Sequence, residues 1–149
     1  MPLPPTVLPG LRSPYETLGG IVHFGRMLDK IRLHRDGKLP PAWVAALGSP
    51  KGLDGRCCRF LKIDHASLVR ETFKGASDEA LLGWSFIRGQ KPDDHEIEIW
   101  NGFMMKLGWR DALTERLHFR LGEIGQPVGA VLTLFDFIDL DEGRPAKFG

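Results

Sequence analysis

The chain is poor in cysteine: among its 149 residues only Cys57 and Cys58 occur, and they are neighbours. Neighbouring cysteines rarely pair with each other, because a disulfide usually needs its two Cα atoms farther apart than one peptide bond places them. No disulfide can therefore join distant parts of the chain, which is typical of proteins from a reducing compartment. We expect two buried, inert thiols, although Arg56 and Arg59 could lower the pKa of one of them.

Long hydrophobic runs are also missing. No stretch approaches the roughly 20 apolar residues that a membrane-spanning helix needs. Residues 1–10 hold four prolines and lack the basic segment and apolar run of a secretory signal. These absences predict a soluble, cytoplasmic protein with no membrane contact. Residues 1–11 are predicted to form a disordered, Pro-rich arm.

An excess of charge of one sign is missing as well, since 20 Lys and Arg stand against 19 Asp and Glu, a net charge of +1. A dedicated nucleic-acid-binding protein normally carries a basic excess, so we predict no nucleic-acid partner. The segment from Arg26 to Arg35 is locally basic, and the mixed charge of a helix surface is the common explanation for such a segment.

What the chain does have is a series of helix-start and helix-stop signals. Ser13, Pro14 and Glu16 resemble the start of a capped helix, and Gly37 marks its end, so one long helix is predicted from Pro14 to Asp36. Gly19, Gly20 and Gly25 are costly inside a helix, and close approach of another helix would explain them. After a Pro- and Gly-rich loop with at most one or two helical turns, further helices are expected over residues 54–61, 64–74, 77–88, 92–107 and 111–123.

The last apolar run, Val128–Leu140, is compatible with a buried strand or a buried helix. Thr133 followed by Asp136 resembles a capping box, which favours a short helix after an extended piece. A single strand would also lack a partner in this chain. The sequence therefore predicts an all-α, single-domain, irregular bundle of five to six helices over residues 12–149.

Five segments together carry a resemblance to a known family: residues 12–20, 26–30, 60–64, 100–101 and 135–144. In order and spacing the chain resembles a bacterial family of unknown function, catalogued as domain of unknown function 5069. The resemblance spans nearly the whole chain after the proline arm, except residues 39–53. It implies a small, mostly helical, stand-alone domain, and no activity or catalytic residue comes with it.

Asp29 is the sharpest candidate for a functional residue. It is predicted near the edge of the apolar face of the first long helix, within side-chain reach of Arg26 and Arg32. A partly buried carboxylate beside guanidinium groups could bind a polar ligand or orient a base, and a structural ion pair is the plainer interpretation. His23 shares a helix face with Arg26 and Lys30, and we include it among the candidates.

The acidic tail contributes Asp139 and Asp141. It resembles the start of a calcium loop, but Arg144 stands where that loop needs glycine and the closing glutamate is missing. The five histidines show no metal-binding spacing. We therefore predict no metal site and no cofactor, with magnesium held by two carboxylates as the remaining alternative to ion pairs.

Trp100 and Asn101 place an aromatic plane beside an amide, a combination that could line a ligand pocket or belong to the core. No phosphate-binding loop or catalytic-serine motif is present. We predict a non-enzymatic module that binds a small polar ligand or a protein. Its site would lie between the first helix, the Trp100 helix and the acidic C-terminal segment. The alternative is a small enzyme with Asp29 or His23 as general base, with a divalent metal as a further option. A third hypothesis is a homodimer through the first helix.

Overall fold

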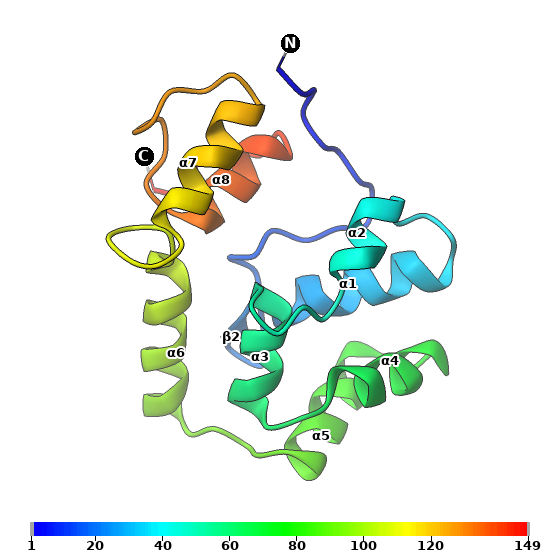
Figure 1. The fold of residues 1–149 in the computed structure, drawn as a ribbon. Coiled ribbons are helices and arrows are strands. Elements are labelled where there is room, and N and C mark those ends of the chain that lie inside the picture. Colours follow the sequence, from blue (N-terminus) through cyan, green and yellow to red (C-terminus); the bar gives the residue numbers. More distant parts are fainter. Residues whose placement is uncertain (1, 149) are drawn as a thin grey trace.

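The computed structural model describes residues 2–148 and is mostly helical (Figure 1). Within these residues there are eight helices and one short hairpin. The hairpin pairs β1 (Thr17–Leu18) with β2 (Ile21–Val22). The helices are α1 (Phe24–Arg35), α2 (Pro41–Ala46), α3 (Leu53–Leu61), α4 (His65–Phe73), α5 (Asp78–Arg88), α6 (Asp94–Lys106), α7 (Thr114–Glu123) and α8 (Leu134–Asp141).

The all-helical prediction is confirmed in outline, but the number of helices is wrong. The residues of α2 were expected in a loop with at most one or two helical turns, whereas short helices were expected at α3 and α8. In the described residues all three segments are helices, since each is short but packs an apolar side against a neighbour. Tertiary packing supplies the stability that helices this short lack on their own.

The predicted start of the first long helix is also wrong. Residues 14–22 do not form a helix, because Gly19 and Gly20 have φ angles of 60° and 80° and turn the chain into the β1–β2 hairpin. Two consecutive residues with positive φ match the hairpin turn that follows the twist of the strands. The Ser13 N–H still donates to the Glu16 carboxylate at 2.9 Å, so the capping-box pattern stabilises a local turn instead of a helix.

The helix starts farther along the chain follow their capping residues closely. Asp64, Ser77 and Thr133 each accept a backbone N–H at the start of α4, α5 and α8. Asp93 and Glu96 form a complete capping box at α6. Only α7 begins later than expected, because the Asp111 carboxylate accepts N–H groups of the preceding loop.

The main apolar core lies between α1, the hairpin and the helices around them. α1 packs against α4, the hairpin packs against α6, and α6 packs against α8. Met27, Leu28 and Ile31 of α1 are fully buried there. Smaller apolar clusters lie between α7 and α8 and beneath α2. α7 and α8 lie at the opposite end of the molecule from α4 and α5 (Figure 1).

The N-terminal segment contains no helix or strand over residues 2–11. Its Leu3 N–H donates to the carbonyl of Glu123, and its Thr6 N–H donates to that of Asp141, so it runs along α7 and α8. Whether it is disordered in solution stays a prediction. Among the described helices, none is both long enough and apolar enough to span a lipid bilayer.

The two thiols lie inside the core, as expected. Cys57 and Cys58 are both buried and unpaired with each other. Burial raises the pKa of the Cys58 thiol to about 12 and that of Cys57 well above its usual value. A reactive thiolate is therefore disfavoured at neutral pH.

Candidate functional site

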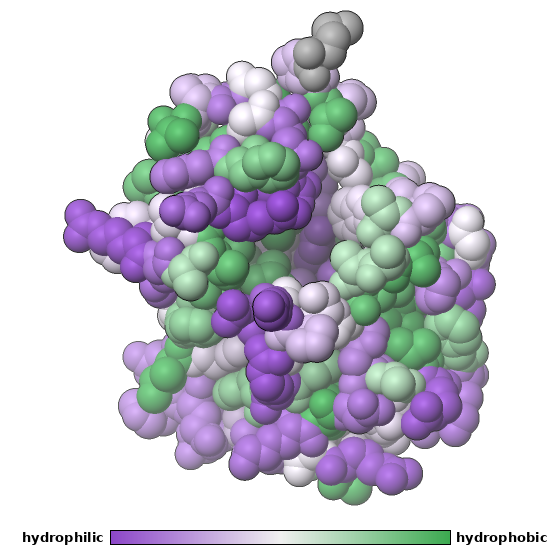
Figure 2. Space-filling model, viewed as in Figure 1, coloured by the Kyte–Doolittle hydropathy of each residue, from purple (hydrophilic) through white to green (hydrophobic). Residues whose placement is uncertain are grey.

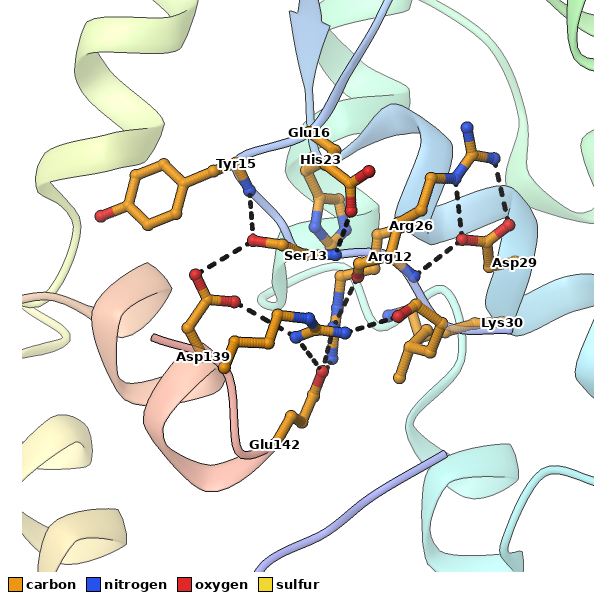
Figure 3. Close-up of polar contacts among 12 residues, drawn as sticks. Arg12, Ser13, Tyr15, Glu16, His23, Arg26, Asp29, Lys30, Asp139 and Glu142 are labelled. Carbon is orange, nitrogen blue, oxygen red and sulfur yellow. Dashed lines mark hydrogen bonds and ion pairs between the residues drawn. The ribbon is translucent and has the colours of Figure 1, made fainter. Parts of the chain in front are cut away.

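Polar and charged side chains from the N-terminal segment, α1, the start of α5 and the C-terminal end of α8 with the residues after it meet in one network, which we call the clasp. Figure 3 shows the part of it around Arg12, Arg26 and Glu142. Its members are Arg12, Ser13, Arg26, Asp29, Arg32, Asp78, Asp139, Glu142 and Arg144. Arg12 contributes its Nε and one terminal nitrogen to the two oxygens of Asp29, at 2.9 and 3.0 Å. Its backbone N–H donates to the same carboxylate.

Gly25 explains why this arginine can lie so close to α1. A Cβ atom at position 25 would come within 2.8 Å of the Arg12 guanidinium carbon, and the guanidinium also donates to the Gly25 carbonyl. The other half of Arg12 binds Asp78 at the first turn of α5. Gly25 therefore permits the close approach of a side chain, where the sequence suggested the approach of another helix.

The deepest pair of the clasp joins α1 to the end of α8. Arg26 donates to both oxygens of Glu142, at 2.8 and 2.6 Å, and both side chains are about 5% exposed. Arg144 donates to Glu142 and to Asp139, and Asp139 also accepts from the Ser13 hydroxyl. Two-point arginine–carboxylate pairs of this kind are strong and directional.

The clasp spans a hollow that separates the α7–α8 part of the molecule from α2 (Figure 2). Arg26 contacts both sides, because it pairs with Glu142 on one side and its guanidinium lies 5.8 Å from the Trp43 ring centre on the other. Four arginines face four carboxylates in the clasp, so its charges compensate one another. It fixes the positions of distant segments and keeps no unpaired charge for a ligand.

A second group of polar residues lies at the start of α1, and we call it the His23 centre: His23, Lys30, Asp54 and Gly48. Asp54 Oδ1 lies 2.8 Å from His23 Nε2 and 2.7 Å from Lys30 Nζ, and its other oxygen accepts the Gly48 N–H. Burial alone would raise the pKa of Asp54, but Lys30 and His23 lower it far below its ordinary value. Asp54 is therefore charged and holds the imidazole in place.

The imidazole of His23 is fully buried, and its Nδ1 atom has no hydrogen-bond partner. The pKa of His23 is lowered to about 4, mainly by burial; Asp54 opposes this shift, and the charges of Lys30 and Arg26 add to it. His65, whose ring contacts Gly48, likewise has a buried nitrogen without a partner. The His23 centre thus differs from the clasp: two buried ring nitrogens at or beside it have no hydrogen-bond partner.

The structure divides the residues suggested by the sequence among several places. Asp29, Arg26 and Asp139 belong to the clasp, and His23 and Lys30 belong to the His23 centre. Asn101 binds the hairpin backbone, accepting from the Val22 N–H and donating to the Gly20 carbonyl. The Trp100 ring stacks on Phe60 with ring centres 4.6 Å apart.

Asp141, at the end of α8, contacts Thr6 of the N-terminal segment and forms none of the ion pairs of the clasp. Its backbone carbonyl accepts from Thr6, and burial raises the pKa of its side chain although Arg120 and Thr6 oppose the shift. The residue after α8 that reaches α1 is Glu142. The Trp100 helix, α6, contributes to the core and to the contact with the hairpin.

A comparison with family models matches residues 9–144 to the family described as Domain of unknown function (DUF5069). The chain belongs to this family. The matched DUF5069 range contains all clasp residues, from Arg12 to Arg144, and the whole His23 centre. The family description states no activity, and a comparison with curated proteins finds no match.

Several members of these DUF5069 networks were missed from the sequence. Arg12 precedes the predicted helix start, and Asp54 and Asp78 lie at the starts of two other predicted helices. Their pairing depends on contacts between residues 17 to 116 positions apart, which no local pattern encodes. Glu142 and Arg144 lie in the acidic tail. The presence of an arginine among its carboxylates was the only sequence pattern that indicated an ion pair there.

Two other features bear on the hypotheses of a metal and of a dimer. Over residues 2–148, no cluster of three or more His, Cys, Asp or Glu side chains is arranged to share a metal ion. The first-helix glycines meet partners within the chain, since a Cβ at Gly19 would meet the Leu82 side chain. A homodimer through α1 stays a prediction, without support from these glycines.

Proposed function

We propose that this domain is a non-enzymatic binding module that takes a small polar ligand at the His23 centre. The observation that supports it is the buried His23 Nδ1, which has no partner while Nε2 is held by Asp54. Leaving a buried polar atom unpaired costs about 1–3 kcal/mol. A ligand that donates an O–H or N–H to this nitrogen would remove that cost.

The backbone at His23 supports the same proposal. His23 has a φ of 68°, a left-handed conformation that residues other than glycine rarely adopt. Its N–H donates to the Pro14 carbonyl at 2.9 Å, and its carbonyl accepts the first helical N–H, that of Met27. Strain of this kind persists where the surroundings enforce it and often occurs at functional sites.

The charge of the imidazole favours binding over catalysis. With its pKa lowered to about 4, the His23 ring is neutral at pH 7. An efficient general base has a pKa near the working pH, so His23 suits hydrogen bonding better than proton transfer. Asp29, the other candidate base, is occupied by three N–H donors of Arg12.

The surroundings restrict the ligand's chemistry. His23 is fully buried, whereas Lys30 beside it keeps 15% of its side chain exposed. The loop of residues 47–52 lies over Asp54 through the Gly48 N–H and is rich in glycine. A ligand would enter when this loop moves, and it would pair its donor with His23 and an acceptor with Lys30.

A thermal-shift screen of small polyols, amides and amino acids tests this proposal, with each hit checked by NMR at the His23 ring nitrogens. We expect a hit to raise the stability of the wild-type protein, by about 2.7 kcal/mol at a concentration 100 times its Kd. The same compound should shift the Nδ1 resonance of His23. His23→Asn, which tolerates the left-handed backbone, should abolish the stabilisation by the ligand.

The control is His95→Asn, which replaces an exposed histidine of α6 and should respond like the wild type. A hit that stabilises the His23→Asn protein as strongly as the wild type would contradict the proposal. So would a panel in which every stabilising compound leaves the His23 ring nitrogens unchanged.

A further inference from the structure

A cavity of about 420 Å³ lies between α4 and α5, away from both the clasp and the His23 centre. Its volume falls within the range of sites that hold small molecules, roughly 300–1,000 Å³. Its walls come from the α3–α4 loop and from the facing sides of the two helices. Neither the clasp nor the ligand proposed at His23 involves this cavity.

Positive side chains dominate the walls. Lys62, Arg70, Lys74 and Arg88 line the cavity together with two acids, Asp64 and Glu71. Both acids already have partners, since Asp64 accepts from the Ser67 N–H and hydroxyl, and Glu71 pairs with Lys74. In the part of the chain that the structure describes, Lys62, Arg70 and Arg88 pair with no carboxylate at salt-bridge distance. Four cations against two carboxylates leave the walls with a net positive charge.

Lys62 occupies an unusual position for a lysine. It ends α3 with a φ of 58°, where glycine or asparagine would be the relaxed choice. This backbone places the lysine at the junction of α3 and α4, on the wall of the cavity. A lysine at this strained position places a cation at the site, although a neutral glycine or asparagine would form the same turn with less strain.

Trp84 adds an unsatisfied donor to the same cavity. The Trp84 side chain lines the wall, its indole Nε1 is buried, and no acceptor lies within hydrogen-bond distance of it. Arg88 lies over the Trp84 ring, with its guanidinium carbon 6.0 Å from the ring centre. An anionic oxygen in the cavity would pair with cations that lack a carboxylate partner and with a donor that lacks an acceptor.

We propose that this cavity is a binding site for a small phosphorylated metabolite. Arginine and lysine donors bind phosphate oxygens through short, charge-assisted hydrogen bonds, and three cations without a carboxylate partner suit a doubly charged phosphate group. The volume leaves room for an organic part beyond the phosphate, with the Trp84 ring on one wall. This site is independent of the ligand proposed at His23.

Titration of the ¹⁵N-labelled protein with inorganic phosphate, adenosine monophosphate and adenosine tests the proposal at low and moderate salt. We expect phosphate and the monophosphate to shift the Trp84 indole resonance in a saturable way, and adenosine to leave it unchanged. Binding should weaken as salt rises, because mobile ions screen the attraction. The double variant Lys62→Asn, Arg88→Gln should bind at least about ten-fold more weakly.

A matched control comes from Arg110, which also has a left-handed φ, of 52°, and lies over a tryptophan ring, Trp109, outside the cavity. Arg110→Asn should keep full affinity. Lys62→Asn alone suits the left-handed backbone, so a weaker affinity in that variant cannot be ascribed to loss of the fold. Equal binding of adenosine and its monophosphate would overturn the proposal, as would an unchanged affinity in the double variant or no saturable shift with any probe.

Discussion

His23 brings together three unusual properties in one residue: complete burial, a left-handed backbone, and a ring nitrogen without a partner. The periodicity of the sequence placed it on a polar helix face near Arg26 and Lys30. In the structure it lies before the helix begins, and Asp54 of α3 is its partner. Long-range burial therefore decides its chemistry.

The first prediction concerns how this histidine affects stability with pH. The folded pKa of about 4 lies below the unfolded value of about 6.5, so the unfolded chain binds more protons between these values. The stability that His23 contributes is present above pH 6.5 and is lost as the pH falls towards 4. The loss should amount to about 3 kcal/mol. Urea unfolding between pH 4.5 and 7.5 measures it.

His23→Asn should flatten this part of the stability profile, whereas His95→Asn should leave it in place. A wild-type stability that stays constant from pH 7 to pH 5 would show that the buried ring does not titrate as inferred.

Among the elements, the hairpin shows most clearly how one pattern can serve two structures. The pattern of Ser13, Pro14 and Glu16 is compatible both with a helix start and with a turn, so it does not distinguish the two structures. Gly19 and Gly20 did carry the distinguishing information, because two adjacent positive φ angles suit a hairpin and interrupt a helix. The two glycines thus indicated the hairpin, although from the sequence they were explained by close packing of helices.

A pair of glycine substitutions tests this explanation. Gly20→Ala forces a side chain into a φ of 80° and should destabilise the protein by about 1–2 kcal/mol. Gly83→Ala lies within α5, where a Cβ meets nothing within 4 Å, and should stabilise it by up to about 1 kcal/mol. Thermal unfolding of the two variants measures both effects, and changes of the same sign would refute the assignment of the turn.

For the molecule as a whole, the clasp joins the two ends of the chain. Arg12 follows the N-terminal segment, Glu142 and Arg144 follow α8, and α1 lies between them and receives both through Asp29 and Arg26. A surface ion pair would contribute little, but a buried pair that loses one partner leaves an uncompensated charge. The clasp should therefore hold the termini in one cooperative unit.

Two matched substitutions separate buried from exposed charge. Glu142→Gln leaves Arg26 and Arg144 without a carboxylate that both contact and should cost about 3–5 kcal/mol. Glu123→Gln removes the partner of Arg120 in an exposed pair and should cost less than about 1 kcal/mol. Urea unfolding at pH 7 compares them, and similar losses in the two variants would mean that the clasp adds no more than a surface pair.

Local chemistry was enough to predict most helices, because a capping side chain and the N–H that it accepts lie within three residues of each other. Asp64, Ser77, Asp93 and Thr133 all begin helices where their side chains indicated. The burial of the cysteines and the all-helical class followed from composition and periodicity in the same way.

The candidate sites required the folded arrangement. Asp29 was a sound choice of buried carboxylate, yet its partner Arg12 and the Arg26–Glu142 pair come from segments far apart along the chain. The cavity between α4 and α5 exists only once two helices lie side by side. Hydrogen bonds between neighbours in sequence are encoded locally, whereas pairing, burial and hollow space arise from packing between elements.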